Sequence, residues 1–292
     1  MKNRILTLLV VCIGVGVTYA EVPKKEKKAL LDLYHNTNGA QWTIPWNLST
    51  PVSQWHGVKV MDGHVVAIDL FRNNLSGTIP KSIGKLPFLS TLNLAFNRIS
   101  GQIPEKITDL RQLKILKLEM NTLEGTLPKG MAKMTALVEL SLFNNVLSGS
   151  IPVGLGALKE LKMLNLSSNQ FSGHIPKELG TLVKLETLGL FENKLEGRIP
   201  NAIGNLSNLK ELVLANNQLG GEIPVEFGML ASLKVLQIQN NKFDSFKNLQ
   251  QMDAQQFLVF DYDTQKTGID YKATDFNRTR MADTLFEDVD DE

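Results

Sequence analysis

Apolar and variable residues alternate in the same short pattern through the middle of the chain. The stretch LNLSSNQFSGHIP, residues 164–176, begins with alternating leucines and then reaches Asn169, Gly173 and Pro176. Alternation with a period of two predicts a half-buried strand whose leucines point inward. The next residues predict a change of direction, because Asn bonds unpaired backbone groups, Gly permits positive φ and Pro fixes φ.

This pattern recurs with a fixed step of 24 residues, marked by Asn73, Asn97, Asn121, Asn145, Asn169, Asn193, Asn217 and Asn241. Repeated in register, these asparagine side chains are expected to form a buried ladder. Such a period is typical of a stacked solenoid, in which each unit buries its apolar face against its neighbours. We expect about eight repeats over residues 65–243, with parallel strands side by side and a short helical segment after each Pro. A narrow row of strands backed by bulkier returns predicts a curved α/β solenoid with a concave parallel β-sheet.

Both ends of the stack are expected to carry caps, because a terminal repeat otherwise exposes its apolar face and its sheet edge. In the segment 21–64, KKEKKALLDLYHNT predicts an amphipathic helix, and Trp42, Trp46 and Trp55 follow it. Clustered Trp residues pack small cores, and they also form carbohydrate or ligand sites. The repeat signature ends at Phe243, so we expect a C-terminal cap over 244–275 and an acidic, disordered tail over 276–292.

The first twenty residues have the composition of a secretory signal peptide. Lys2 and Arg4 precede an apolar run that is shorter than the roughly 20 residues needed to span a bilayer, and Ala20 ends the segment. We expect cleavage after Ala20, with an uncleaved anchor as the alternative, and a secreted, extracellular or cell-surface protein (periplasmic in a bacterium). Cys12, the only cysteine, lies in this segment, so the mature chain has no disulfide.

The repeat units resemble plant-type leucine-rich repeats, whose distinguishing feature is the L-x-G-x-I-P portion seen here from about residue 65 to 242. This resemblance implies a right-handed superhelix that binds other molecules rather than transforming them. The segment WHGVKVMDGHVVAIDL resembles the W-x-G-V opening of plant repeat ectodomains, but Val60 stands where those carry a cysteine. The cysteine-free cap is similar to that of leucine-rich proteins exported by bacteria.

Composition and motifs favour recognition over chemistry. A formal net charge of +1 offers no basic footprint for nucleic acid. The four histidines lack metal-ligand spacing, and no nucleophile or phosphate-binding motif is present. Asp261 and Asp263 suggest a calcium loop, but its Gly and its closing Glu are missing. We therefore expect no enzyme activity, no cofactor, no metal and no nucleic-acid partner.

Outward residues next to each strand form columns across the repeats, and four of them are phenylalanines predicted to face solvent. Exposed aromatic residues in a polar surround are typical of interface hot spots, although Phe is also common at this repeat position. The expected ligand-binding residues of the concave face are Phe71, Arg72, Phe96, Lys117, Glu119, Phe143, Asn165, Phe191 and Glu192.

Three functions fit this surface. The first is a monomeric recognition module that binds a protein or peptide through the concave face. The second is an adhesive or structural surface protein that binds polysaccharide through its Asn, Ser and Gln columns and the Trp-rich cap. The third, implied by resemblance to plant polygalacturonase-inhibiting proteins of similar length, is an inhibitor of a secreted hydrolase.

Overall fold

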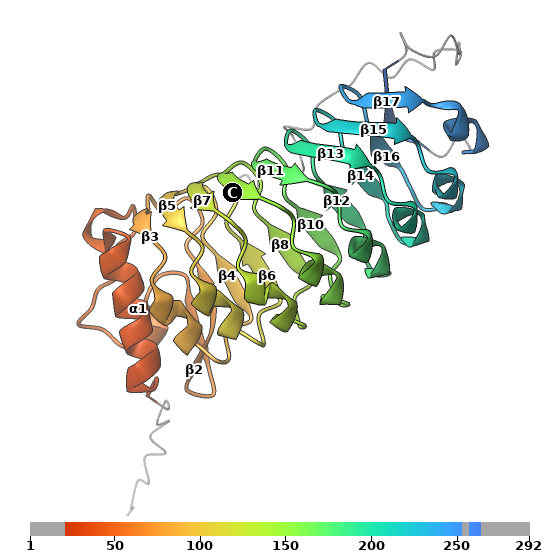
Figure 1. The fold of residues 1–292 in the computed structure, drawn as a ribbon. Coiled ribbons are helices and arrows are strands. Elements are labelled where there is room, and N and C mark those ends of the chain that lie inside the picture. The colour runs from red at the N-terminus through yellow and green to blue at the C-terminus, as the bar shows by residue number, and fades with distance from the viewer. Residues whose placement is uncertain (1–20, 253–256, 264–292) are drawn as a thin grey trace, which may run out of the picture.

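The L-x-x-L-x-L segments form one side of a curved solenoid (Figure 1), which the computed structural model describes over residues 21–252 and 257–263. Ten strands lie in the order β1-β2-β4-β6-β8-β10-β12-β14-β16-β18. Only β1 runs antiparallel to its neighbour; the strands from β2 onward are parallel. The strands are β1 Val58–Met61, β2 His64–Asp69, β4 Thr91–Asn93, β6 Ile115–Lys117, β8 Glu139–Ser141, β10 Met163–Asn165, β12 Thr187–Gly189, β14 Glu211–Val213, β16 Val235–Gln237 and β18 Val259–Asp261.

The pairing register keeps equivalent residues of successive repeats directly opposite each other. Leu92 pairs with Leu116, Leu116 with Leu140, and Leu140 with Leu164. These leucines are no more than 1% exposed, so the 24-residue period becomes a continuous buried column. The expected concave sheet and solenoid are therefore confirmed.

A second sheet of eight strands is formed by the segments that follow the repeat asparagines, one strand from each repeat. The sequence pattern did not predict this sheet. Its order is β17-β15-β13-β11-β9-β7-β5-β3. Each strand is short, and every strand from β5 to β17 buries one large apolar residue, such as Phe171 in β11. The strands are β3 Ser76–Thr78, β5 Arg98–Gln102, β7 Thr122–Gly125, β9 Val146–Gly149, β11 Gln170–Gly173, β13 Lys194–Arg198, β15 Gln218–Glu222 and β17 Lys242–Ser245.

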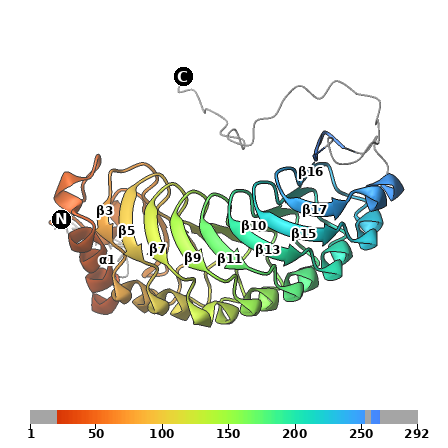
Figure 2. The ribbon, with the colours of Figure 1, turned by 45° about the horizontal axis from the view of Figure 1, so that its top comes forward.

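The segments after each proline form single 3-10 turns on the convex side, where Figure 2 shows them along the outer edge of the curve. In the repeats, Pro holds the residue before the turn in extended backbone, as at Pro104 with φ −67° and ψ 136°. The turns are η3 Lys81–Lys85, η4 Glu105–Asp109, η5 Lys129–Lys133, η6 Val153–Ala157, η7 Lys177–Thr181, η8 Asn201–Asn205, η9 Val225–Met229 and, after Phe246, η10 Lys247–Gln251.

The repeat asparagines form the ladder that the sequence predicts. Asn121 donates from Nδ2 to the Leu94 carbonyl 27 residues earlier at 3.0 Å, and its Oδ1 accepts the Ile99 N–H at 2.9 Å. The same two bonds recur in the following repeats up to Asn241. Each side chain therefore joins its own turn to the previous repeat.

The N-terminal segment packs against the first repeat through helix α1 Lys24–Asn36, the turns η1 Gly39–Gln41 and η2 Val52–Gln54, and strand β1. The Glu26 side chain is 4% exposed, and its carboxylate accepts the Val65 N–H at 2.9 Å and lies 2.6 Å from His64 Nδ1. Strand β1 pairs with β2 and covers the first edge of the concave sheet. These elements supply what a capped stack requires.

At the other end, β18 adds a last parallel strand beside β16, and the aromatic rings of Phe257 and Phe260 stack 4.8 Å apart. The expected signal peptide over 1–20, the acidic tail over 276–292 and part of the expected C-terminal cap lie outside the described residues. Within 21–252 and 257–263, no helix is long and apolar enough to cross a membrane.

Candidate functional site

The expected binding residues lie along the concave sheet, but they differ in exposure. Phe71 is 42% exposed, whereas Phe96, Phe143 and Phe191 are half-buried. Four fully solvent-facing phenylalanines are therefore not found. Other column members are buried outright, such as Val213 at 1%. On the inside of a curved sheet, side chains from strands about 4.8 Å apart cover one another, so column membership does not guarantee exposure.

An aromatic pair lies where the first two strands of the repeats end. The rings of Phe71 and Phe96 are 5.1 Å apart between centroids and inclined by 56°. Phe71 follows β2 and Phe96 follows β4, so the pair depends on the register that places Asp69 beside Asn93. Arg72, next to Phe71, is exposed. The structure thus brings together three of the expected binding residues as an aromatic surface with an adjacent cation.

The middle of the concave face holds charged residues with partners of their own. Lys117 Nζ lies 3.0 Å from the Glu139 carboxylate of the next repeat. Burial raises the pKa of Glu119, against the opposing effect of hydrogen bonds, one of them with Ser141, and of the Lys117 charge. Its Oε2 is buried without a hydrogen-bond partner among the described residues. Phe143, one repeat further along, is half-buried. The charged side chains of this region therefore interact with one another within the fold, and little aromatic surface is exposed beside them.

Asn165, Phe191 and Glu192 are placed separately from the aromatic pair. The Ser168 hydroxyl donates to Glu192 Oε2 at 2.8 Å, and Asn165 Oδ1 accepts the Ser167 N–H at 3.1 Å. Five strand spacings separate Phe71 from Phe191, or roughly 24 Å along the sheet. Contact with both would require a ligand extended across most of the concave face.

One backbone feature of this face was not foreseen. Arg72, Phe96 and Glu192 have φ of 47°, 56° and 51°, in the left-handed region that is unfavourable for residues other than Gly and Asn. The equivalent residue of every repeat, from Arg72 to Asn240, shares this conformation. The positive φ is therefore a property of the turn that precedes each repeat asparagine. It directs these side chains without marking a particular repeat as functional.

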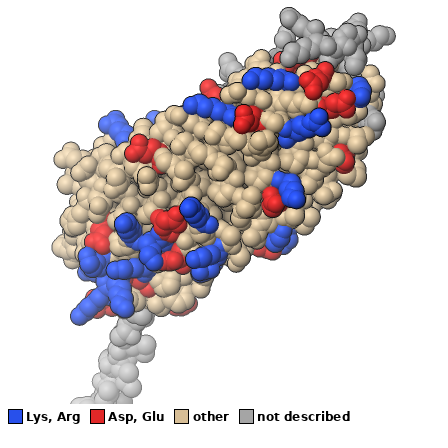
Figure 3. Space-filling view, in the orientation of Figure 1, with Lys and Arg blue, Asp and Glu red and all other residues tan. Residues whose placement is uncertain are grey.

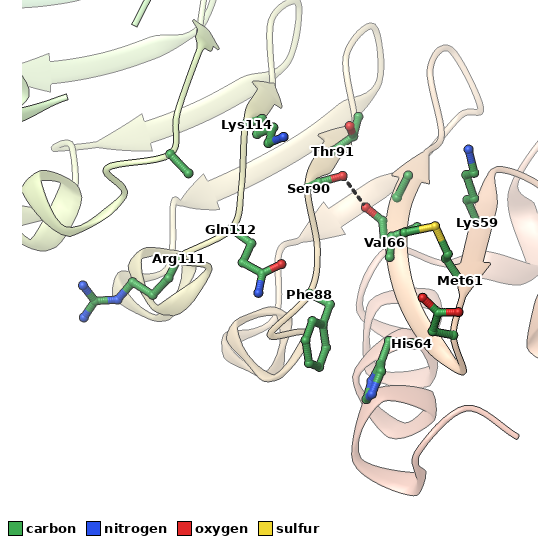
Figure 4. A pocket seen from close by; sticks show the side chains of 13 residues that line it. Lys59, Met61, His64, Val66, Phe88, Ser90, Thr91, Arg111, Gln112 and Lys114 are labelled. Atoms are coloured by element: carbon green, nitrogen blue, oxygen red, sulfur yellow. Dashed lines mark hydrogen bonds between the residues drawn. The ribbon is translucent and has the colours of Figure 1, made fainter. Parts of the chain in front are cut away.

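A hollow of about 600 Å³ opens at the starts of the first concave strands, beside the β1–β2 hairpin (Figure 4). Phe88, 39% exposed, packs its ring against His64 with centroids 4.1 Å apart. Lys59, Arg111 and Lys114 contribute cations to the lining. The sequence pattern did not reveal this hollow, since its walls come from a hairpin and from loops of different repeats.

The three tryptophans do not form a ligand site. Trp42, Trp46 and Trp55 are between 2% and 4% exposed, and Trp46 stacks on Trp55 with centroids 4.8 Å apart. Their ring N–H groups donate to backbone carbonyls within the cap. The three rings therefore pack inside the N-terminal segment, as one of the two interpretations of this cluster has it, and they present no exposed aromatic face to a polysaccharide. Among the described residues, no group of three or more His, Cys, Asp or Glu could hold a metal ion.

Family models match the repeats directly. A model described as leucine-rich repeat region matches residues 70–172, and one described as leucine rich repeat matches 184–206 and 208–230. The chain is also 30% identical to the ectodomain of BIR2 from Arabidopsis thaliana and covers 88% of it, with 55% of the present chain aligned and a TM-score of 0.51. This chain is a leucine-rich repeat protein. The plant-type repeat and solenoid expected from its sequence are thereby confirmed.

Two further structures resemble this leucine-rich repeat protein. The Arabidopsis receptor kinase HAESA, in complex with the peptide hormone IDA and a co-receptor, is 28% identical over 84% of the chain, with a TM-score of 0.73. A leucine-rich repeat protein of Leptospira interrogans is 36% identical over 65% of the chain and 47% of its own, with a TM-score of 0.55. The chain spans less than half of the plant hormone receptors it matches, from 31% of one receptor to 44% of a HAESA ectodomain.

Proposed function

We propose that this leucine-rich repeat protein recognises a peptide, or an extended segment of a protein, outside the cell through the first repeats of its concave face. The observation that carries the proposal is the contact between Phe71 and Phe96 beside the exposed Arg72. Aromatic residues and arginine are the residue types most enriched among interface hot spots. Lys117, Glu119, Phe143, Asn165, Phe191 and Glu192 would contact only a longer ligand.

Similarity to known proteins supports this proposal. HAESA, which has the same repeat architecture, was solved in complex with a peptide hormone. The parallel sheet of the present chain provides a rigid row of outward side chains, and rigid presentation lowers the entropic cost of ordering a ligand. Recognition by a single copy of the chain, without catalysis, is the simplest mechanism that uses these features.

Selection from a displayed peptide library on immobilised protein, residues 21–292, tests the proposal. The counter-target is the double variant Phe71→Ala/Phe96→Asn. Other repeats already carry these residues: Ala95 and Ala215 stand at the position of Phe71, and Asn144, Asn216 and Asn240 stand at the position of Phe96. The variant therefore keeps residues that these turns accept. Peptides retained by the wild-type protein and lost on the variant are expected. Equal retention on both would refute the proposed site.

Polysaccharide binding is a second candidate, favoured by a different surface. Ser76, Ser100, Ser148 and Ser172 lie in one column of the second sheet, which also holds Glu124 and Glu196, and Figure 3 shows few charged residues over β5 and β7. Hydroxyl groups repeated along a sheet can match a repeating sugar chain. Binding to a glycan array by both wild type and the aromatic variant would support this candidate over the first.

A further inference from the structure

We propose that the hollow beside the β1–β2 hairpin binds an acidic side chain together with an apolar side chain of the peptide ligand. The inference rests on the proposed function, because it assigns part of the same ligand. The hollow would form a second subsite at the opposite ends of the same strands, and this subsite would select an acidic residue and an apolar residue of the ligand.

The charges of the lining favour an anion. Lys59, Arg111 and Lys114 supply three cations, and Asp62 is the one carboxylate among the lining residues. None of the three cations forms an ion pair, with nitrogen and carboxylate oxygen within 4.0 Å, among residues 21–252 and 257–263. Arg111 donates from Nη1 to the Lys133 carbonyl at 3.1 Å, which leaves its other N–H groups for a ligand.

Most other lysines on the surface of the sheet have a partner, and this contrast distinguishes the hollow. Lys117 pairs with Glu139, and Lys162 and Lys210 both pair with Glu186. An unpaired group of cations beside low-dielectric walls attracts an anionic ligand more strongly than isolated surface lysines do. The residues around the hollow are therefore suited to a carboxylate.

The walls also carry exposed apolar surface. Met61 is 56% exposed and Phe88 is 39% exposed, and Figure 4 shows both facing the hollow from the hairpin and from the loop before β4. Contact between His64 and Phe88 holds the aromatic ring in place, while Glu26 lies 2.6 Å from the other side of the imidazole. An apolar side chain next to the acidic one would cover Met61 and Phe88 and remove their surface from water.

The hollow and the aromatic pair lie within reach of one short peptide. Ala67 lines the hollow and Phe71 belongs to the pair, so four residues of strand, or about 13 Å, separate the two subsites. Asp69 lies between them and accepts hydrogen bonds from Asn93 and from the Phe71 N–H. A ligand with its acidic residue at the hollow and uncharged residues over Asp69 fits this charge pattern.

The test uses two fluorescein-labelled peptides, Gly-Glu-Leu-Glu-Gly and Gly-Gln-Leu-Gln-Gly, with fluorescence anisotropy on residues 21–292. We expect the acidic probe to bind at least about fivefold more tightly than the amide probe at low salt, because each exposed ion pair contributes up to ~1 kcal/mol. The difference should disappear in Arg111→Gln/Lys114→Gln. It should persist in Lys129→Gln/Lys177→Gln, which removes two exposed convex lysines and changes the net charge equally.

Equal affinity for the two probes, or no binding of the acidic probe up to on the order of 1 mM, would overturn the proposal. Binding that appears only after Glu287, Asp288, Asp290 and Asp291 are changed to amides would assign the hollow to the chain's own C-terminal segment and would also overturn it. These outcomes concern the hollow alone. If the library selection retains the same peptides on the wild type and the aromatic variant, the probe titrations at the hollow would not change. The two proposals can therefore be refuted separately.

Discussion

Asn145 donates from Nδ2 to the carbonyl oxygen of Leu118 at 3.0 Å, across the boundary between two repeats. The same amide accepts the Leu123 N–H through Oδ1 at 2.9 Å. One buried side chain thereby satisfies backbone groups of the preceding repeat that the turning chain leaves unpaired. Stacking of the repeats depends on these bonds as well as on the leucine columns.

Replacing Asn145 by Ala should therefore destabilise the protein by about 2–4 kcal/mol, because buried donors and acceptors lose their partners. Urea unfolding followed by circular dichroism measures the change. Asn205→Ala is the matched control, since Asn205 is exposed, and its effect should remain within about 0.5 kcal/mol. Similar losses for the two variants would show that the ladder contributes little.

The Glu26 carboxylate should hold the N-terminal cap on the first repeat. In Glu26→Ala the Val65 N–H loses its acceptor, and a buried unsatisfied donor costs about 1–3 kcal/mol. Hydrogen exchange should accelerate in β1 and β2 and remain unchanged in repeats beyond residue 115, because contacts in a solenoid are local. Exposed Glu21→Ala provides the control. Unchanged exchange in β1 and β2 would contradict this role of Glu26.

Glu119 should reduce stability at neutral pH. Its pKa in the folded protein is raised by burial above the ordinary value of 4.5, so between the unfolded and the folded pKa the folded state binds more protons than the unfolded state. The contribution of this carboxyl to stability therefore falls as pH rises from the unfolded pKa through the folded pKa. Glu119→Gln should raise the melting temperature by roughly 1–3 °C at pH 7.

The same comparison at a pH below 4 serves as the control for Glu119→Gln. Both states are then protonated at Glu119, and the two proteins should melt at similar temperatures. An equal gain at both pH values would mean that packing, not charge, explains the substitution. A loss of stability at pH 7 would contradict the raised pKa.

The alternating leucines and the 24-residue step were sufficient to predict the concave sheet, its register and the asparagine ladder. The second sheet was missed because segments such as Gln170–Gly173 bury one large residue and contain Gly, so in isolation they lack strand periodicity. They become strands only because equivalent segments of adjacent repeats lie side by side. The stacking that defines them is absent from any single repeat.

Prediction of the candidate site was partial for a related reason. Repeat period gives the column of a residue, but exposure depends on the size of its neighbours: Phe71 is exposed beside Ala95 and Phe96, while Ser141 is buried. The hollow depends on the antiparallel pairing of β1 with β2, which has no equivalent elsewhere in the concave sheet. Neither feature can be obtained from the period.

The most direct test of the central claim is isothermal titration calorimetry with one peptide selected from the library. Loss of hot-spot aromatic residues costs about 2 kcal/mol or more in binding, so Phe71→Ala/Phe96→Asn should bind at least roughly 30-fold more weakly than wild type. The control, Met229→Ala, removes an exposed apolar side chain from convex η9 and should bind like wild type. Wild-type affinity in the double variant, at an unchanged melting temperature, would contradict recognition by the concave aromatic pair.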